Sequence, residues 1–301
     1  MPELPEVYTI VNYLQKKIKG EVFKTAWTDT PKLFGGEKQF RKLTTKLQEQ
    51  RIVSVTRVGK NILFNFSGNL TLLAHQKMSG HFLVGKWDKI KKEGVISWLP
   101  SNQKLSSKTQ IALKNSANRF IHLVIEFKSG QMLALSDMRK FARIEMLEST
   151  NIYKESRLKN LGPDWWDNPL PPKELLKMAK RGNRRLKPFL LDQSIAAGLG
   201  NIYVDETLFR AGLSPLRKTT TLNLKDAQKL VAAIKKTLAV AIKKGGTSFS
   251  DYRQANGEKG LYQNVLKVYG RKNEKCFICG TKLIGIKIGQ RSSVYCPHCQ
   301  K

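Results

Sequence analysis

The sequence predicts an α+β protein with a β-rich N-terminal domain, a helical domain and a small C-terminal hairpin. Up to about residue 147, apolar residues alternate with polar ones or form short runs, which is typical of strands. From about residue 152 they recur every three or four positions, as in helices. All four cysteines lie in two close pairs near the end of the chain. With 301 residues and 41% apolar content, two ordinary domains can each bury a core.

The first predicted element is an amphipathic helix that begins near Pro5, within the opening residues MPELPEV. Its apolar positions at helical spacing are Val7, Ile10, Val11, Leu14 and Ile18. A proline suits the first turn of a helix, and the carboxylate of Glu6 suits its positive end. The helical pattern gives no reason for Pro2 and Glu3.

Short strands are predicted next, separated by Gly, Asn and Ser residues. The stretches with strand character are residues 51–58, 61–66, 70–75, 81–85, 121–127 and 131–137. Their number and spacing predict an antiparallel sandwich or barrel. Between Lys86 and Asn118 the chain is rich in Lys and Ser, which predicts a long exposed excursion to which the sequence assigns no function.

The second half contains three predicted helices, within residues 171–180, 201–212 and 223–246. Prolines suit the first turn of the first helix, Gly212 caps the end of the second, and an Asn begins the third, which stops at Gly245. The third helix presents one apolar face, made of Leu230, Val231, Ile234, Leu238 and Ile242. Residues 245–262 are predicted to be a mobile loop.

The cysteines have the spacing C-x2-C-x16-C-x2-C, at Cys276, Cys279, Cys296 and Cys299. Four thiolates in two close pairs can surround one tetrahedral Zn2+, with a β-hairpin in the spacer. The alternative is two disulfides or idle thiols, which fits a cytosolic, basic chain less well. His298 could compete as a ligand, but with four cysteines present we expect it to face solvent or phosphate.

The charge of the chain indicates a polyanionic partner. Lys and Arg number 54 against 23 Asp and Glu, which gives a net charge of +31 and a pI near 10.1. Nucleic acid is favoured over a membrane, because no apolar run approaches the ~20 residues of a spanning helix. No secretory segment follows Met1, so we expect a cytoplasmic, nucleoid-associated protein. Up to this point the sequence indicates a nucleic-acid binder without showing an enzyme.

Several motifs, in order along the whole chain, carry a resemblance to a known family. They are MPELPEV, HQKMSGHF (75–82), LGPDW (161–165), LLDQSIAAGLGNIYVDE (190–206), VYGRKNEKC (268–276) and QRSSVYCPHCQK (290–301). Together they resemble formamidopyrimidine-DNA glycosylase, of the Fpg/Nei group of base-excision repair enzymes. The resemblance implies a β-sandwich flanked by helices, then a helix-two-turns-helix domain with a zinc finger, with double-stranded DNA bound between them. It implies domains at 1–150, 151–262 and 263–301, and a monomer.

The resemblance also supplies a chemical reason for the first residues. Removal of Met1 would make Pro2 a free secondary amine, which can attack the sugar C1′, expel the base and form a Schiff base. The resemblance implies that the DNA strand is then cut by β,δ-elimination. It also implies one structural Zn2+, which supports the fold of the zinc finger. Glu3 is implied to be the general acid and Glu6 its support. The simpler alternative for both carboxylates is a charged helix start.

Four further residues correspond to family positions at the DNA. Lys60 is implied to reach the active site on a strand, as a proton donor or a phosphate clamp. Arg291 corresponds to the zinc-finger arginine that holds phosphate and assists δ-elimination. Asn201 follows glycines that let the chain approach a phosphate closely. Lys187 aligns with a lysine at the damaged nucleotide. For Lys60 the plain alternative is one more exposed lysine.

A glycosylase that extrudes a base must fill the gap left in the stack. The resemblance implies Met78 as an apolar plug, Arg139 as a donor to the orphaned base and Phe141 as a wedge. Without the family, these would be a core Met, a surface Arg and a core Phe. The set favours oxidised purines such as 8-oxoguanine and formamidopyrimidines. The alternatives are a Nei-like enzyme for oxidised pyrimidines and a catalytically silent damaged-DNA-binding protein.

Three features depart from the family pattern. The usual D-P-R-R-F-G is here Asp137 to Ala142, without its rigid proline and its glycine, which puts the wedge geometry in question. The usual K-H-x-H is Arg119 to His122, which removes one expected DNA-contacting histidine. The 86–118 excursion is longer than the family pattern. None of these departures touches Pro2 or Glu3.

Overall fold

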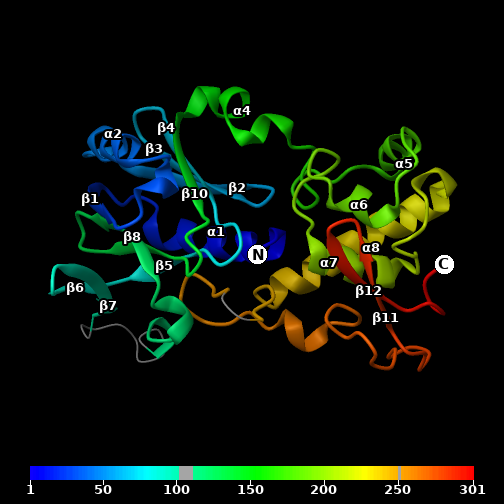
Figure 1. Cartoon of the computed structure of the whole chain (residues 1–301). Coiled ribbons are helices and arrows are strands. Elements are labelled where there is room, and N and C mark those ends of the chain that lie inside the picture. Colours follow the sequence, from blue (N-terminus) through cyan, green and yellow to red (C-terminus); the bar gives the residue numbers. More distant parts are fainter. Residues whose placement is uncertain (102–110, 250–251) are drawn as a thin grey trace. The chain divides into compact units, whose positions relative to one another are not determined.

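The computed structural model describes residues 1–101, 111–249 and 252–301, and its chain forms two compact units (Figure 1). The first unit comprises Met1–Lys159 and Lys244–Leu261, and the second comprises Asn160–Lys243 and Tyr262–Lys301. The chain therefore enters the second unit, returns to the first for residues 244–261 and ends in the second. The expected boundary at 262 placed this returning segment with the helices, whereas it packs with the sandwich.

The first unit is a β-sandwich, as the sequence predicts. Its strands are β1 (Phe23–Thr28), β2 (Ile52–Val58), β3 (Asn61–Phe66), β4 (Leu70–His75), β5 (His81–Gly85), β8 (Ile121–Phe127), β9 (Met132–Ser136) and β10 (Arg143–Glu148). They form two four-stranded sheets with the orders β1-β8-β9-β5 and β10-β4-β3-β2. Every neighbouring pair is antiparallel.

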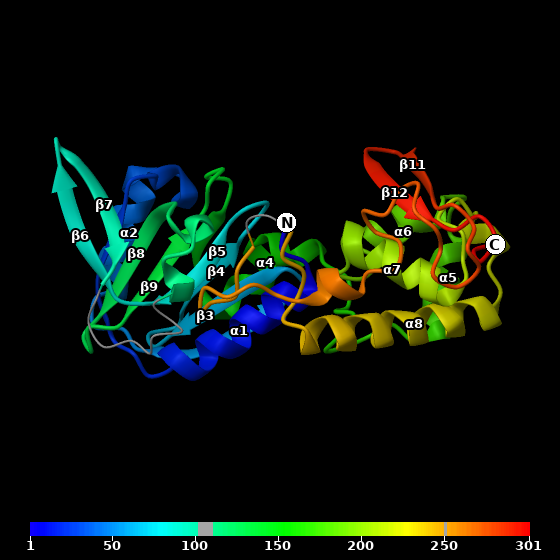
Figure 2. The same ribbon diagram turned by 90° about the horizontal axis from the view of Figure 1, so that it is seen from below.

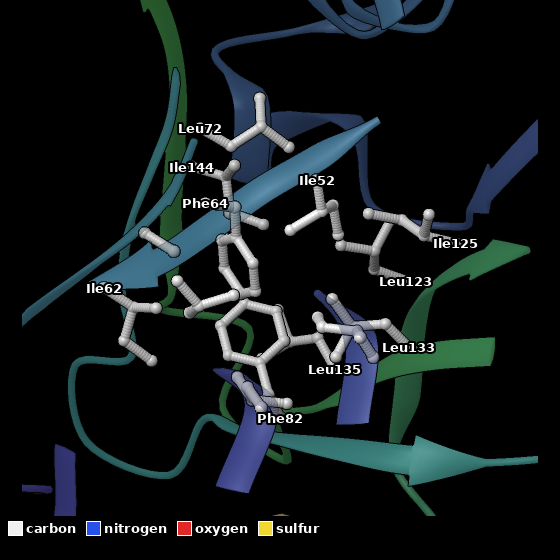
Figure 3. Packing of buried hydrophobic residues seen from close by; sticks show 14 of the residues in the cluster. Ile52, Ile62, Phe64, Leu72, Phe82, Leu123, Ile125, Leu133, Leu135 and Ile144 are labelled. Carbon is white, nitrogen blue, oxygen red and sulfur yellow. The ribbon is translucent and has the colours of Figure 1, made fainter. Parts of the chain in front are cut away.

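The core lies between the two sheets, and side chains from both sheets meet in it (Figure 3). Phe64 of β3 and Phe82 of β5 pack edge to face, with ring centroids 5.2 Å apart. Such aromatic pairs stabilise a core by about 1 kcal/mol beyond the area they bury. This contact joins the two sheets, whose strand ends carry the β4–β5 and β9–β10 loops.

Helix α1 (Leu4–Ile18) packs against β2 and β3, and α2 (Glu37–Leu47) lies beside β1. The α1 face predicted to be apolar is buried. Pro5 lies in its first turn, where a missing N–H costs nothing. Because the helix begins at Leu4, Pro2 and Glu3 are held against a packed element instead of fraying.

Part of the 86–118 excursion forms a β-hairpin that the sequence does not predict. It consists of β6 (Trp87–Lys92) and β7 (Val95–Pro100). The exposure expected of this region is confirmed for the described residues 88–95, but Trp87 is buried and Trp98 lies 5.7 Å from Trp27 between ring centroids. Residues 102–110 of the excursion lie outside the described part of the chain.

The second unit is mainly helical (Figure 2). Its helices are α5 (Pro172–Lys180), α6 (Leu186–Leu191), α7 (Asn201–Ala211) and α8 (Leu224–Lys243), and its hairpin is β11 (Ile284–Ile288) with β12 (Arg291–Tyr295). The predicted caps are present: Gly212 is left-handed, with φ +71°, and Asn223 accepts the N–H of Asp226 at 2.9 Å. In α8, Leu230, Ile234 and Leu238 are buried, as predicted.

Short elements complete the chain. They are the helix α4 (Ile152–Glu155) and the 3-10 turns Pro31–Phe34, Ser116–Asn118, Ser149–Asn151, Arg157–Asn160, Thr219–Thr221 and Tyr262–Val265. In the described ranges, no helix is both long enough and apolar enough to cross a membrane.

Candidate functional site

The start of the chain forms a buried polar site on the first unit. Pro2 is buried, and the Glu3 side chain is 3% exposed. Glu3 is the N-cap of α1, and its backbone N–H donates to Oε2 of Glu6 at 2.8 Å. The three-residue spacing read from the sequence therefore produces a real contact between the Glu6 carboxylate and the backbone that carries Glu3.

Glu6 also binds the returning segment. Its Oε1 accepts the N–H of Thr247 at 2.7 Å. Gly246 lies beside it with φ +79°, and a Cβ there would come within 2.6 Å of the same oxygen, so this approach requires glycine. The Tyr252 hydroxyl donates to the Glu6 carbonyl at 3.3 Å, and burial raises the pKa of Tyr252 well above its usual value, which keeps this donor protonated.

The described residues of the 245–262 loop are anchored, contrary to the expectation of a mobile segment. Tyr252 and Ala255 belong to the sandwich core, and the Ala255 carbonyl accepts the N–H of Val84 in β5 at 2.9 Å. The glycine-rich composition that suggested mobility instead serves close packing, as at Gly246. Residues 250 and 251 lie outside the described part of the chain.

Lys60 lies in the two-residue turn Gly59-Lys60 between β2 and β3, at a strand end and not within the strand. Its side chain is only 7% exposed. The next residue, Asn61, pairs across the sheet with His75 at the end of β4. Lys60 and His75 interact electrostatically, so the strand ends bring a cation and an imidazole together.

His75 was not predicted as a site residue, although it opens the HQKMSGHF motif. Burial lowers its pKa to about 3, helped by the positive charges of Lys77, Arg157 and Lys60. Its Nδ1 accepts the N–H of Lys77 at 3.0 Å, so the neutral ring carries its proton on Nε2. His75 can therefore donate a hydrogen bond without carrying charge.

The lowered pKa of His75 predicts a pH-dependent stability. The unfolded chain takes up a proton near pH 6.5, whereas folded His75 resists it until about pH 3, so stability is lost as pH falls through this window. We expect His75→Asn to remove roughly 1 kcal/mol of the loss between pH 7 and 5.5. Urea unfolding at both pH values measures it. Parallel losses in wild type and variant would contradict this assignment.

The three predicted gap-filling residues lie on two neighbouring loops. Met78 lies between β4 and β5 and is 41% exposed, while Arg139 and Phe141 lie between β9 and β10. Phe141 is 47% exposed, and the Arg139 guanidinium lies 4.6 Å from its ring centroid. Large apolar side chains exposed at adjacent loop tips are available to enter another molecule.

Asp137 ties these two loops together. It is fully buried, and its carboxylate accepts the Ser79 hydroxyl at 2.6 Å and the N–H groups of Arg139 and Ala142 at 3.3 and 2.8 Å. The loop that lacks the family's proline and glycine is therefore closed by side-chain-to-backbone hydrogen bonds. Met138, in place of the proline, is exposed and does not disturb them.

On the second unit, Lys187 is fully buried, and its ammonium donates to Oδ1 of Asp205 at 2.8 Å and to the carbonyl of Ser292 at 2.6 Å. Asp205 also accepts the Ser293 hydroxyl at 2.7 Å. Instead of the expected place at the damaged nucleotide, the structure puts this ammonium inside the protein. It joins α6 and α7 to β12 directly beside Arg291.

Glu206, next to Asp205 on α7, anchors the segment that leads to the cysteines. Its carboxylate accepts three successive N–H groups, from Lys267, Val268 and Tyr269, each at 2.9 Å. Burial raises its pKa despite these bonds. Asp205 and Glu206 lie in the 190–206 motif, where the sequence assigns them no role, and nothing in their spacing indicates partners so far along the chain.

Asn201 is the first residue of α7, after a loop that Gln193 closes. The Gln193 amide donates to the Leu199 carbonyl at 2.9 Å and accepts the Gly198 N–H at 3.0 Å, where Gly198 has φ +117°. Asn201 Oδ1 is buried and has no hydrogen-bond partner among the described residues. The 11-residue helix that begins here places its positive dipole end at Asn201, which suits a phosphate.

The four cysteines converge as the spacing predicts. Their Sγ atoms lie within 4.8 Å of one another, with 4.0 Å between Cys276 and Cys299 and 3.5 Å between Cys279 and Cys296. A tetrahedral ion with Zn–S bonds of ~2.3 Å needs S–S separations of about 3.8 Å, so the cluster fits Zn2+. All four are free of disulfides, and His298 is exposed. The protein thus has one structural zinc site.

Arg291 is the first residue of β12 and is exposed at the β11–β12 turn, opposite Ile288. Two features fix β12, the strand that begins with Arg291. Its C-terminal end leads into Cys296 of the zinc site, and Lys187, paired with Asp205, donates to the carbonyl of Ser292. The exposed guanidinium is therefore presented from a rigid hairpin.

A basic β-sandwich, a helical unit and a four-cysteine zinc hairpin are together the features of a zinc-finger protein that binds DNA. Residues 1–144 match the family model described as the formamidopyrimidine-DNA glycosylase N-terminal domain. Residues 161–253 match the H2TH domain of the same enzymes, and residues 273–301 match the zinc finger found in FPG and IleRS. The chain belongs to the formamidopyrimidine-DNA glycosylase family. The members of this family are glycosylases of base-excision repair.

Relatives and solved structures match over the full length. The formamidopyrimidine-DNA glycosylases of Ureaplasma parvum and Rhodopseudomonas palustris are 34% and 37% identical, each covering 100% of both chains. Among solved structures, Lactococcus lactis Fpg in complex with DNA containing an abasic site has a TM-score of 0.82 and 29% identity over 100% of both chains. MutM in complex with DNA containing carbocyclic 8-oxo-G has the same TM-score, identity and coverage.

Proposed function

We propose that this protein is a bifunctional DNA glycosylase and abasic-site lyase that removes oxidised purines from duplex DNA. The observation that carries the proposal is the buried start of the chain, where Pro2 precedes Glu3 and the Glu6 carboxylate holds the Glu3 backbone. This arrangement places a potential amine nucleophile and a carboxyl group next to each other on a fixed helix start. The family membership supports the glycosylase class of the reaction.

The chemistry requires removal of Met1, which a small second residue permits and which frees the ring nitrogen of Pro2. This nitrogen attacks C1′ of the damaged nucleotide, the glycosidic bond breaks, and the base leaves with its electron pair and the proton that the attacking nitrogen gives up. Glu3 protonates the sugar ring oxygen as the ring opens. The result is an iminium, which carries its positive charge at any pH.

The iminium then acts as an electron sink. It acidifies the C2′ proton, whose loss expels the 3′ phosphate, and a second elimination expels the 5′ phosphate. Lys60 and the exposed Arg291 are proposed to bind the departing phosphates, and Asn201 to bind a neighbouring one at the start of α7. Glu6 positions Glu3 through the chain backbone.

The preference for purines rests on Met78, Arg139 and Phe141, which lie on two loops joined by Asp137. Met78 fills the gap, Phe141 wedges a base step and Arg139 donates to the acceptors of an orphaned cytosine. The net charge of +31 supports double-stranded DNA as the partner. We further propose that the protein acts as a monomer at the nucleoid.

A lesion panel tests the reaction and the substrate together. Duplexes carrying 8-oxoguanine opposite C and 5-hydroxyuracil opposite G are incubated with the zinc-loaded protein, with and without borohydride. We expect faster release of 8-oxoguanine, and a borohydride-trapped covalent adduct through Pro2. Faster release of the pyrimidine would favour the Nei-like alternative. DNA binding without any adduct would favour the catalytically silent alternative.

A further inference from the structure

Three cationic side chains gather at the end of β4 and the start of β10, outside the residues assigned above. Lys77 lies in the β4–β5 loop, and Arg143 begins β10 directly opposite His75. Arg157 follows α4. The Lys77 ammonium interacts electrostatically with Arg157, Arg143 and Glu145. Three cations against one carboxylate leave this cluster with a charge of +2.

The cations are incompletely neutralised within the described chain. Glu145 pairs with Arg157. Arg143 donates to the carbonyl of Lys32 at 3.0 Å, which occupies one of its nitrogens. Lys77 makes no hydrogen bond or ion pair through its ammonium in the described residues, although burial and the two arginines lower its pKa. A cluster of this kind is stabilised by an anion from outside.

The backbone conformation of Lys77 also supports an anion site here. Lys77 has φ +54°, in the left-handed region that costs a residue with a Cβ roughly 1 kcal/mol. A glycine would adopt this conformation without strain. The chain instead keeps a long cation here, next to the exposed Met78 and two residues before the Asp137-linked Ser79.

The location defines the ligand. Lys77 immediately precedes Met78, and Arg143 lies two residues after Phe141, so the cluster stands at the base of both loops that carry the proposed gap-filling residues. A base step that received Met78 or Phe141 would bring its own backbone close to these cations. The group available there is a phosphodiester, which lysine and arginine bind by charge-assisted hydrogen bonds.

We propose that Lys77, Arg143 and Arg157 form an accessory phosphate site that binds one backbone phosphodiester of the DNA beside the displaced base. This inference rests on the proposed function, because it needs DNA engaged at the two loops. The accessory site adds a contact to the DNA backbone at the position where the base stack is opened. The site does not require the lesion to be a purine.

Methylphosphonate scanning tests the site. Full-length, zinc-loaded protein is bound to duplexes with a tetrahydrofuran abasic analogue, each carrying one neutral methylphosphonate at a defined position on either strand. For wild type we expect one position near the analogue to cost roughly fivefold in affinity through the accessory site. In Lys77→Asn, which tolerates a left-handed backbone, that penalty should disappear while the penalties at other positions remain.

Matched variants complete the test. Lys77→Arg should restore the penalty, since it restores the charge. Lys19→Met, at the far end of α1 about 20 Å along the helix, should behave as wild type. Lys77→Asn should also lower the salt dependence of binding by about one counterion. An unchanged methylphosphonate profile and salt slope in Lys77→Asn would overturn the accessory site.

The borohydride result separates this inference from the proposed function. If wild type traps an adduct while Lys77→Asn keeps the wild-type binding profile, only the accessory site is wrong. If wild type binds the duplexes without ever trapping an adduct, the proposed chemistry is wrong, while a profile altered in Lys77→Asn still supports the phosphate site. Thermal unfolding should show Lys77→Asn at least as stable as wild type, which excludes unfolding as the cause.

Discussion

Replacing Pro2 with glycine should lower strand cleavage at an 8-oxoguanine duplex by about a thousandfold, roughly 4 kcal/mol in activation free energy, with DNA affinity nearly unchanged. A glycine start offers a primary amine, whose imine is an electron sink only while it is protonated. The proline iminium carries its charge permanently. Pro2 is buried and its side chain bears no charge, so its loss removes chemistry and few DNA contacts.

Single-turnover cleavage and equilibrium binding of the same duplex measure the two effects separately. Glu3→Gln is the matched variant, because it keeps the amine and removes the proton donor; it should slow base release while still allowing adduct formation at a preformed abasic site. A non-cleavable extension before Pro2 should abolish the adduct. If the Pro2→Gly enzyme cleaves at the wild-type rate, the reaction does not need the secondary amine of proline, and an adduct that survives the extension would show that the amine at residue 2 is not the nucleophile.

The elements with strong local signals are the ones that the sequence predicts correctly. Helix α8 follows from an Asn cap and an apolar face, and α7 ends at Gly212 where a left-handed residue is needed. The β6–β7 hairpin was missed because its strands are held by Trp87 and Trp98 on the outer face of the sandwich. Its Lys-rich outward positions mask the alternation on which strand prediction depends.

The site shows the same contrast between local and distant partners. The Glu3–Glu6 contact spans three residues and could be predicted, whereas the bond from Thr247 to Glu6 spans 241. Lys187 was expected at the DNA because it aligns with a family lysine at the damaged nucleotide. Its burial depends on Asp205, 18 residues later, and on the Ser292 carbonyl, 105 residues later. Only a folded chain can show such a pairing, because an unpaired lysine would not be buried.

The four-cysteine site carries the second large prediction: removing zinc should unfold the terminal hairpin and leave the sandwich folded. The hairpin has only a small core, made of Phe209, Val268, Leu283, Val294 and two of the cysteines. Zinc binding supplies about 10 kcal/mol or more of folding free energy in hairpins of this kind. The sandwich has an independent core that contains none of the ligands.

Because Arg291 is presented from this hairpin, zinc removal should also weaken DNA binding by an order of magnitude or more, reversibly on adding zinc. Chelator titration followed by amide hydrogen exchange at β11 and β12 and by DNA affinity measures both effects. Cys296→Ser should reproduce the loss, whereas His298→Ala should keep one zinc per chain, because His298 is exposed and outside the four-thiolate cluster. Retained exchange protection in the hairpin after complete zinc removal would show that the protein core, and not the metal, holds Arg291 in place.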